Sequence, residues 1–152
     1  MAVAVEAVGV QMVADRLIQA DSDLAWTNLT DDDAAEMLAL ATLTKPGPFA
    51  AETHRLGRFI GVKQDGVLIA MAGERLRLPG FTEVSGVCTH PDHRGRGYAA
   101  ALMRTVMARI IATGETPFLH AYANNTGAIA LYEALGFRVR RDMAVTGLVK
   151  AG

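Results

Sequence analysis

The segment from Val87 to Thr113 constrains the fold more than any other part of the chain. A short apolar run, Val87 to Thr89, stops at Pro91, and two glycines, Gly95 and Gly97, then precede a longer patterned stretch. In that stretch apolar residues recur every three or four positions, which is typical of an amphipathic helix: Ala99, Leu102, Met103, Val106, Met107, Ile110 and Ile111. A strand that leads into such a helix needs a sheet for the helix to cover, so the sequence predicts an α/β fold.

Local turn and cap residues predict the elements on either side of this segment. Asp65-Gly66 lies between two β-rich runs and predicts a hairpin. Gly86 inside a strand predicts a bulge or a close backbone approach. Asn125 and Gly136 are the cap and the stop of another helix. The expected helices cover residues 12–20, 31–43, 95–113 and 125–135, and the expected strands cover residues 58–63, 67–75, 82–89, 117–123 and 137–148.

Composition narrows the class of protein. The 152 residues suit one domain, and a net charge of -1 does not favour a nucleic-acid partner. Residues 1–76 hold 6 basic and 11 acidic side chains, whereas residues 77–152 hold 9 and 5, so the second half would attract an anion. One cysteine excludes an internal disulfide, residues 1–10 lack the basic start of a secretory signal, and no apolar run approaches the ~20 residues of a membrane span. We expect a cytoplasmic protein with no membrane partner.

The segment Arg94-Gly95-Arg96-Gly97-Tyr98-Ala99 predicts an anion site at a helix N-terminus. Unpaired backbone N–H groups and the helix dipole favour a phosphate there, and glycines keep side chains out of its way. Two arginines suit a pyrophosphate. A Walker loop is excluded, because Gly97 is followed by Tyr-Ala instead of Lys-Ser/Thr. The spacing of Gly95, Gly97 and Ala100 matches a relaxed dinucleotide fingerprint, but no acidic residue follows in 121–125.

Two motifs together resemble the GNAT N-acetyltransferases. Residues 94–99 resemble the acyl-CoA motif Arg/Gln-x-x-Gly-x-Gly/Ala, and residues 125–137, Asn-Thr-Gly-Ala-Ile-Ala-Leu-Tyr-Glu-Ala-Leu-Gly-Phe, resemble the second family motif. The chain is similar to the FR47-like subgroup over residues 58–148. The resemblance implies a central, mostly antiparallel sheet with one splayed parallel strand pair and flanking helices. It also implies a single domain over residues 1–152, with an acetyl-CoA-binding core at 58–148 and an acceptor-side region at 1–57.

The same resemblance implies a role for each matching residue. Val87, Cys88 and Thr89 would pair with the pantetheine arm of acetyl-CoA, and Asn125 would contact that arm. The pyrophosphate would lie on Arg94, Gly95, Arg96, Gly97, Tyr98 and Ala99. Tyr132 would protonate the leaving thiolate, and Glu83 or a water would be the general base. The implied reaction is direct acetyl transfer to a primary amine of a small molecule or peptide, with acetyl-CoA as co-substrate and no metal.

Several alternatives stay open at this stage. Tyr132 could be a packing aromatic, Glu83 a solvent-facing strand residue, and Cys88 a nucleophile with His90 or His120. His90 and His93 do not have a recognised zinc spacing. Acceptor contacts are expected from Trp26 and from Phe49 in the 45–54 segment, and the acidic first half of the chain favours a cationic amine. A non-catalytic acyl-CoA-binding or regulatory module is the alternative function, and the oligomeric state is open between monomer and homodimer.

Overall fold

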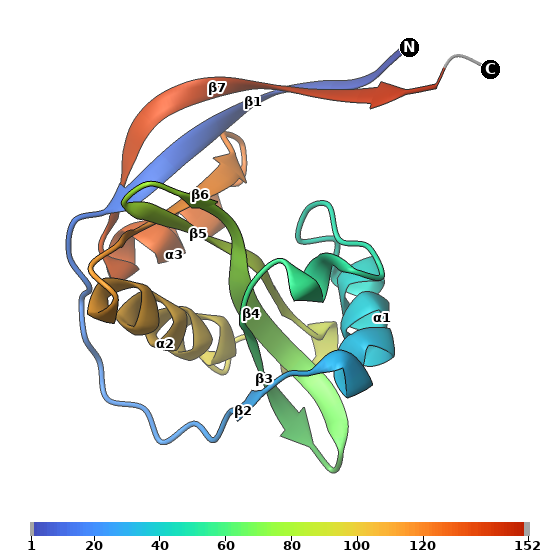
Figure 1. Ribbon diagram of the computed structural model, residues 1–152, viewed down its shortest axis with the longest axis vertical. Coiled ribbons are helices and arrows are strands. Elements are labelled where there is room, and N and C mark those ends of the chain that lie inside the picture. Colours follow the sequence, from blue (N-terminus) through green and yellow to red (C-terminus); the bar gives the residue numbers. More distant parts are fainter. Residues whose placement is uncertain (1, 151–152) are drawn as a thin grey trace. The chain divides into compact units, whose positions relative to one another are not determined.

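The computed structural model describes residues 2–150 and divides the chain into two compact units (Figure 1). One unit combines the residues up to Ile18 with those from Phe118 onward, and the other is formed by Gln19–Pro117. Three α-helices lie among seven strands in the described residues, which confirms the expected mixture of α and β elements.

The Gln19–Pro117 unit is built on four antiparallel strands in the order β2-β3-β4-β5. Their bounds are β2 Thr27–Asn28, β3 Phe59–Gln64, β4 Val67–Leu78 and β5 Phe81–Thr89. Asp65 and Gly66 both have positive φ, 52° and 78°, as a type I′ hairpin turn requires. The predicted hairpin and the third strand are therefore confirmed.

The predicted irregularity at Gly86 is a bulge in β5. Met71 pairs with Cys88 and Gly73 pairs with Ser85, so two residues of β5, Gly86 and Val87, face one residue of β4. Gly86 has a φ of 66°, and a Cβ there would lie 2.7 Å from the Phe59 ring. Any other residue would strain the backbone and displace the phenyl group, which explains the glycine.

Two helices pack against this sheet, one on each side of β3 and β4 (Figure 1). The first, α1 (Ala34–Thr44), follows a 3-10 turn at Asp31–Asp33, which Thr30 and Asp33 close with a capping box. Its buried residues join strand residues in a core cluster: Met37, Leu40, Ala41, Phe59, Leu68, Met71 and Cys88. The second, α2 (Tyr98–Ala112), buries Leu102, Met103, Val106, Met107 and Ile110. Both predicted helices are confirmed.

In the other unit, β1 (Ala2–Ala14) lies between β6 (Thr116–Tyr122) and β7 (Phe137–Val149), antiparallel to both. The helix predicted at residues 12–20 is therefore wrong. Met12, Val13 and Ala14 are buried, and Met12 and Val13 are paired with strands on both sides, whereas residues 17–26 form neither helix nor strand. Pairing on both sides satisfies the backbone N–H and C=O groups, and valines at positions 3, 5, 8, 10 and 13 favour the strand.

The last helix, α3 (Thr126–Leu135), starts at the predicted cap Asn125 and ends at Gly136. Gly136 has a φ of 115°, and a Cβ there would lie 2.2 Å from the carbonyl oxygen of Arg16. The Ile18 N–H donates to the Leu135 carbonyl at 3.0 Å, so the segment after β1 passes directly over the end of α3. Glycine is required here for conformation and for space.

Candidate functional site

The predicted anion loop lies immediately before α2. A 3-10 turn, Pro91–His93, follows β5, and the Nδ1 atom of His90 caps it by accepting the Asp92 N–H at 3.1 Å. Arg96 donates to Nδ1 of His93 at 3.3 Å. Gly95 and Gly97 follow with φ of 77° and 80°, and a Cβ at either position would meet nothing within 4 Å. Open space lies beside both glycines.

The start of α2 is well suited to an anion. Gly97 is its N-cap and offers no side chain to the first-turn N–H groups, while its own carbonyl accepts from Ala101 at 3.1 Å. Arg94 and Arg96 are exposed beside this helix end and add two guanidinium groups. Unpaired amides, the helix dipole and two arginines together provide the charge and donors that a pyrophosphate needs.

Cys88 is a buried residue of β5 and has the properties of a packing residue. Its side chain belongs to the α1 core cluster, and burial raises the pKa of the thiol to about 11. The thiol therefore stays protonated at neutral pH, which makes it a poor nucleophile. His90, one of its suggested bases, uses Nδ1 to cap the following turn. A cysteine mechanism has no support in this geometry.

Glu83 is almost completely buried, with 1% of its surface exposed, so the alternative of a solvent-facing strand residue is wrong. Arg75 donates to both carboxylate oxygens, from Nε at 2.6 Å and from Nη2 at 3.1 Å. A buried carboxylate needs such a partner. To act as a base, Glu83 would have to share its oxygens between Arg75 and the incoming amine or a water.

Asn125 and Tyr132 lie in the other unit, on α3. The Asn125 side chain accepts the Ala128 N–H at 3.3 Å and so fixes the first turn of the helix. Tyr132 is half-buried, with its ring edge-on to Phe137 at a centroid distance of 6.2 Å. Burial raises the pKa of the Tyr132 phenol, so this hydroxyl holds its proton throughout the neutral range.

The two residues expected to contact the acceptor are not brought together. Trp26 is 40% exposed and lies under the Arg109 guanidinium of α2, 4.8 Å from the ring centroid, while Arg109 also donates to Asn28. Phe49 lies on the α1 side, edge-on to Phe59 at 5.8 Å and next to the Gly86 bulge. The structure gives Trp26 a stacking partner and leaves Phe49 beside the strand expected to bind the pantetheine.

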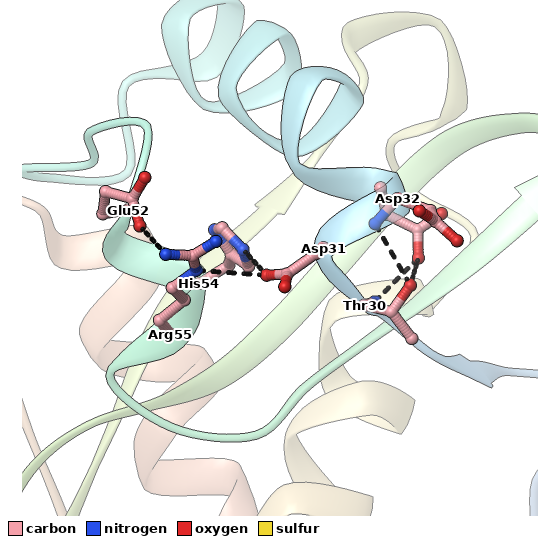
Figure 2. Close-up of polar contacts among 7 residues, drawn as sticks. Thr30, Asp31, Asp32, Glu52, His54 and Arg55 are labelled. Carbon is pink, nitrogen blue, oxygen red and sulfur yellow. Dashed lines mark hydrogen bonds and ion pairs between the residues drawn. The ribbon is translucent and has the colours of Figure 1, made fainter.

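A further pair in this unit was not singled out from the sequence. Nε2 of His54 lies 2.7 Å from a carboxylate oxygen of Asp31, which Arg55 also contacts at 3.2 Å (Figure 2). These hydrogen bonds, from His54 first and Arg55 second, lower the pKa of Asp31. The two partners are 23 positions apart, and no spacing rule connects them. In the sequence, Asp31 is only the first residue of the helix expected at 31–43.

Two other kinds of site are absent from the part of the chain that the structure describes. Among residues 2–150, no group of three or more His, Cys, Asp or Glu side chains is arranged to hold a metal ion. Within the same residues, no helix has the length and apolar character to cross a membrane.

The anion loop and the elements around it match a known protein family. The model of the family described as FR47-like protein matches residues 59–145, which is more than half of the chain. The chain belongs to this FR47-like family. The match covers the three strands β3, β4 and β5, the anion loop, α2, β6 and α3. The family resemblance seen in residues 94–99 and 125–137 is thereby confirmed.

Solved structures show that this chain has the fold of the GNAT acetyltransferases. A putative GNAT-family acetyltransferase from Novosphingobium aromaticivorans is 52% identical with a TM-score of 0.90, covering 95% of this chain and 65% of its own. The ribosomal-protein-S18-alanine N-acetyltransferase of Escherichia coli shares the fold at 18% identity, with a TM-score of 0.64 and coverage of 84% and 96%. The expected fold class is confirmed.

A curated relative is the N-alpha-acetyltransferase RimI of Mycobacterium tuberculosis. It is 33% identical to this chain over 100 residues, which is 61% of this chain and 62% of RimI. The chain therefore spans less than two thirds of the length of RimI and of the Novosphingobium protein.

Proposed function

We propose that this protein is an acetyl-CoA-dependent N-acetyltransferase that transfers the acetyl group directly to a primary amine. The observation that carries the proposal is the start of α2, where Gly95 and Gly97 leave open space beside uncapped amides and two arginines. Family membership supports acetyl-CoA as the co-substrate, since the fold neighbours are acetyltransferases. The pyrophosphate would be held by residues 94–99, the pantetheine arm by the backbone of Val87, Cys88 and Thr89, and Asn125 would contact the same arm.

The chemistry requires a neutral amine, a polarised thioester and a protonated leaving group. The amine nitrogen attacks the thioester carbonyl carbon, the C–S bond breaks, and the thiolate takes a proton from Tyr132. The nitrogen loses its proton to Glu83 or to a water. Because burial raises the pKa of the Tyr132 phenol, the hydroxyl carries its proton when the thiolate forms.

The acceptor we favour is the α-amine at a peptide N-terminus, with small primary amines as the wider class. Support comes from the names of two relatives, an N-alpha-acetyltransferase and a ribosomal-protein-alanine N-acetyltransferase. We assign acetyl-CoA binding to residues 58–148 and acceptor contacts to the part of 1–57 that follows β1, with Phe49 supported by its place beside the bulge and Trp26 retained as a weaker candidate. A cytoplasmic location stays a prediction from composition.

Free-thiol release from acetyl-CoA tests the proposal. The panel contains short peptides with a free N-terminal residue, the same peptides with a blocked N-terminus, polyamines and free amino acids. We expect thiol release that depends on a free amine and is strongest with the unblocked peptides. Acetyl-CoA binding without release from any amine would favour the regulatory module instead.

A further inference from the structure

The unexplained feature of the Gln19–Pro117 unit is one ring nitrogen of His54. Only 7% of the His54 side chain is exposed, and its Nδ1 atom is buried with no hydrogen-bond partner among the described residues. Buried polar atoms are almost always paired, because an unpaired one loses its water without compensation. The buried Nδ1 atom of His54 therefore has a free hydrogen-bonding position for a group from outside the described residues.

The environment of the ring fixes what that partner must offer. The other nitrogen, Nε2, faces the Asp31 carboxylate, whose side chain is 68% exposed, and the Asp31 pKa is lowered (Figure 2). An ionised carboxylate keeps the proton on Nε2, so in the neutral ring Nδ1 carries a lone pair. The partner at Nδ1 is then a hydrogen-bond donor, such as the N–H of an amine.

The His54 ring lies in the part of the chain that is expected to contact the acceptor. His54 is in a 3-10 turn, Thr53–Arg55, joined to Phe49 by one tight turn in which the Ala50 N–H donates to the Thr53 hydroxyl at 2.8 Å. Phe49 rests beside the Gly86 bulge. At the other end Gly57 lies against the backbone of Glu74, whose partner in β5 is Val84. The 49–57 segment is thus anchored at both ends on β4 and β5, next to the stretch expected to hold the thioester.

From these contacts we propose that Nδ1 of His54 binds the amine of the acceptor, accepting a hydrogen bond from its N–H, with Asp31 as the positioning residue that fixes the ring. The proposal rests on the proposed function for the identity of the ligand. Access requires a small opening of the 49–57 segment. The ion pairs of Arg55 with Asp31 and Glu52 are exposed, so they oppose such an opening only weakly.

The substitution His54→Gln separates the two ring nitrogens. A glutamine amide can still donate to Asp31 from the position of Nε2, but it offers nothing at Nδ1. We expect kcat/KM for an unblocked peptide to fall about tenfold or more, with an unchanged Kd for acetyl-CoA. The control is Glu52→Gln, which removes an exposed ion pair of the same segment and leaves His54 intact. A wild-type kcat/KM in His54→Gln would overturn the proposal.

A second test uses the wild-type protein, so it depends neither on the folding of His54→Gln nor on measurable turnover. In protein labelled with nitrogen-15 at histidine and saturated with CoA, the spectrum should show His54 as the Nε2–H tautomer. Its Nδ1 resonance should move saturably on titration with the unblocked peptide and stay fixed with the N-acetylated peptide. An Nδ1 resonance that ignores both peptides would overturn the proposal. The proposed function fails separately, by absence of thiol release from the wild type, whatever the Nδ1 resonance does.

Discussion

Among single residues, Tyr132 carries the clearest chemical expectation. Tyr132→Phe keeps the ring against Phe137 and removes only the hydroxyl. We expect kcat to fall about 100-fold while the Kd for acetyl-CoA stays the same, because the proton donor is lost and the packing is not. Steady-state kinetics and calorimetry check the two quantities. An equal loss in both would make Tyr132 a packing residue.

The raised pKa of Tyr132 also sets the pH dependence. A phenol whose pKa lies above its ordinary value near 10 stays protonated, and so competent as an acid, until the pH rises beyond that value. We therefore expect no loss of kcat from this group up to about pH 10. An alkaline loss of kcat at lower pH that persists in Tyr132→Phe would have to come from another group.

A charge reversal at Arg94 tests whether the anion loop binds the pyrophosphate. It is exposed and in an ordinary extended conformation, so Arg94→Glu strains no backbone. Reversing its charge beside a pyrophosphate should weaken acetyl-CoA binding at least tenfold, measured by calorimetry. The matched control is Arg141→Glu, an exposed residue of β7 outside the loop. Equal affinities in the two variants would show that the pyrophosphate binds elsewhere.

At the scale of elements, the start of α1 depends on the capped 3-10 turn that precedes it. Asp33 is buried, accepts the Thr30 N–H at 2.8 Å and pairs with Lys63 at 2.5 Å. Asp33→Asn should lower the free energy of unfolding by about 2 kcal/mol at pH 7, because it leaves the Lys63 ammonium without its carboxylate. Asp32→Asn, an exposed neighbour, should change it by less than about 0.5 kcal/mol. Urea unfolding of both variants measures the difference.

The pH dependence of this effect has a defined sign. The Lys63 hydrogen bond, followed by that of Thr30, lowers the pKa of Asp33 in the folded protein. The carboxylate thus stabilises the fold above its unfolded pKa of about 3.9, and this contribution is lost as the pH falls through the lower, folded value. The gap between wild type and Asp33→Asn should narrow below about pH 4. A gap that is constant down to acid pH would contradict the ion pair.

Two glycines of one helix make a second test at this scale. Gly136→Ala places a Cβ against the Arg16 carbonyl at positive φ and should destabilise the protein by about 3 kcal/mol. Gly127, in the first turn of α3, has open space and no positive φ, so Gly127→Ala should be neutral or slightly stabilising. Thermal unfolding compares them. Similar effects of the two substitutions would mean that the segment after β1 does not pass over the helix end.

Elements with strong local signals were predictable, and β1 was not. The Asp65-Gly66 turn, the apolar period of α2 and the Asn125 and Gly136 caps each act within a few residues, so the sequence displays them. The strand at Ala2–Ala14 is defined by partners more than 100 positions away, Phe118 and Leu119 on one side and the start of β7 on the other. Spaced apolar residues near position 12 therefore suggested a helix.

On the scale of the whole molecule, the parts of the site also divide into those encoded by neighbouring residues and those formed by distant segments. The anion loop is contiguous, so its residues could be named from the sequence. The pair of Asp31 with His54 and the pairing of Glu83 with Arg75 depend on how distant segments meet, and only the structure shows them. The separation of Trp26 from Phe49 has the same origin, since each packs beside a different helix.

The central claim is that the chain binds acetyl-CoA through the glycine loop before α2. Calorimetric titration of the wild-type protein with acetyl-CoA tests it most directly, with the Arg94→Glu and Arg141→Glu proteins titrated under the same conditions. The account predicts one saturable site that is lost in Arg94→Glu and retained in Arg141→Glu. No binding by the wild type, or binding that is indifferent to Arg94, would contradict it.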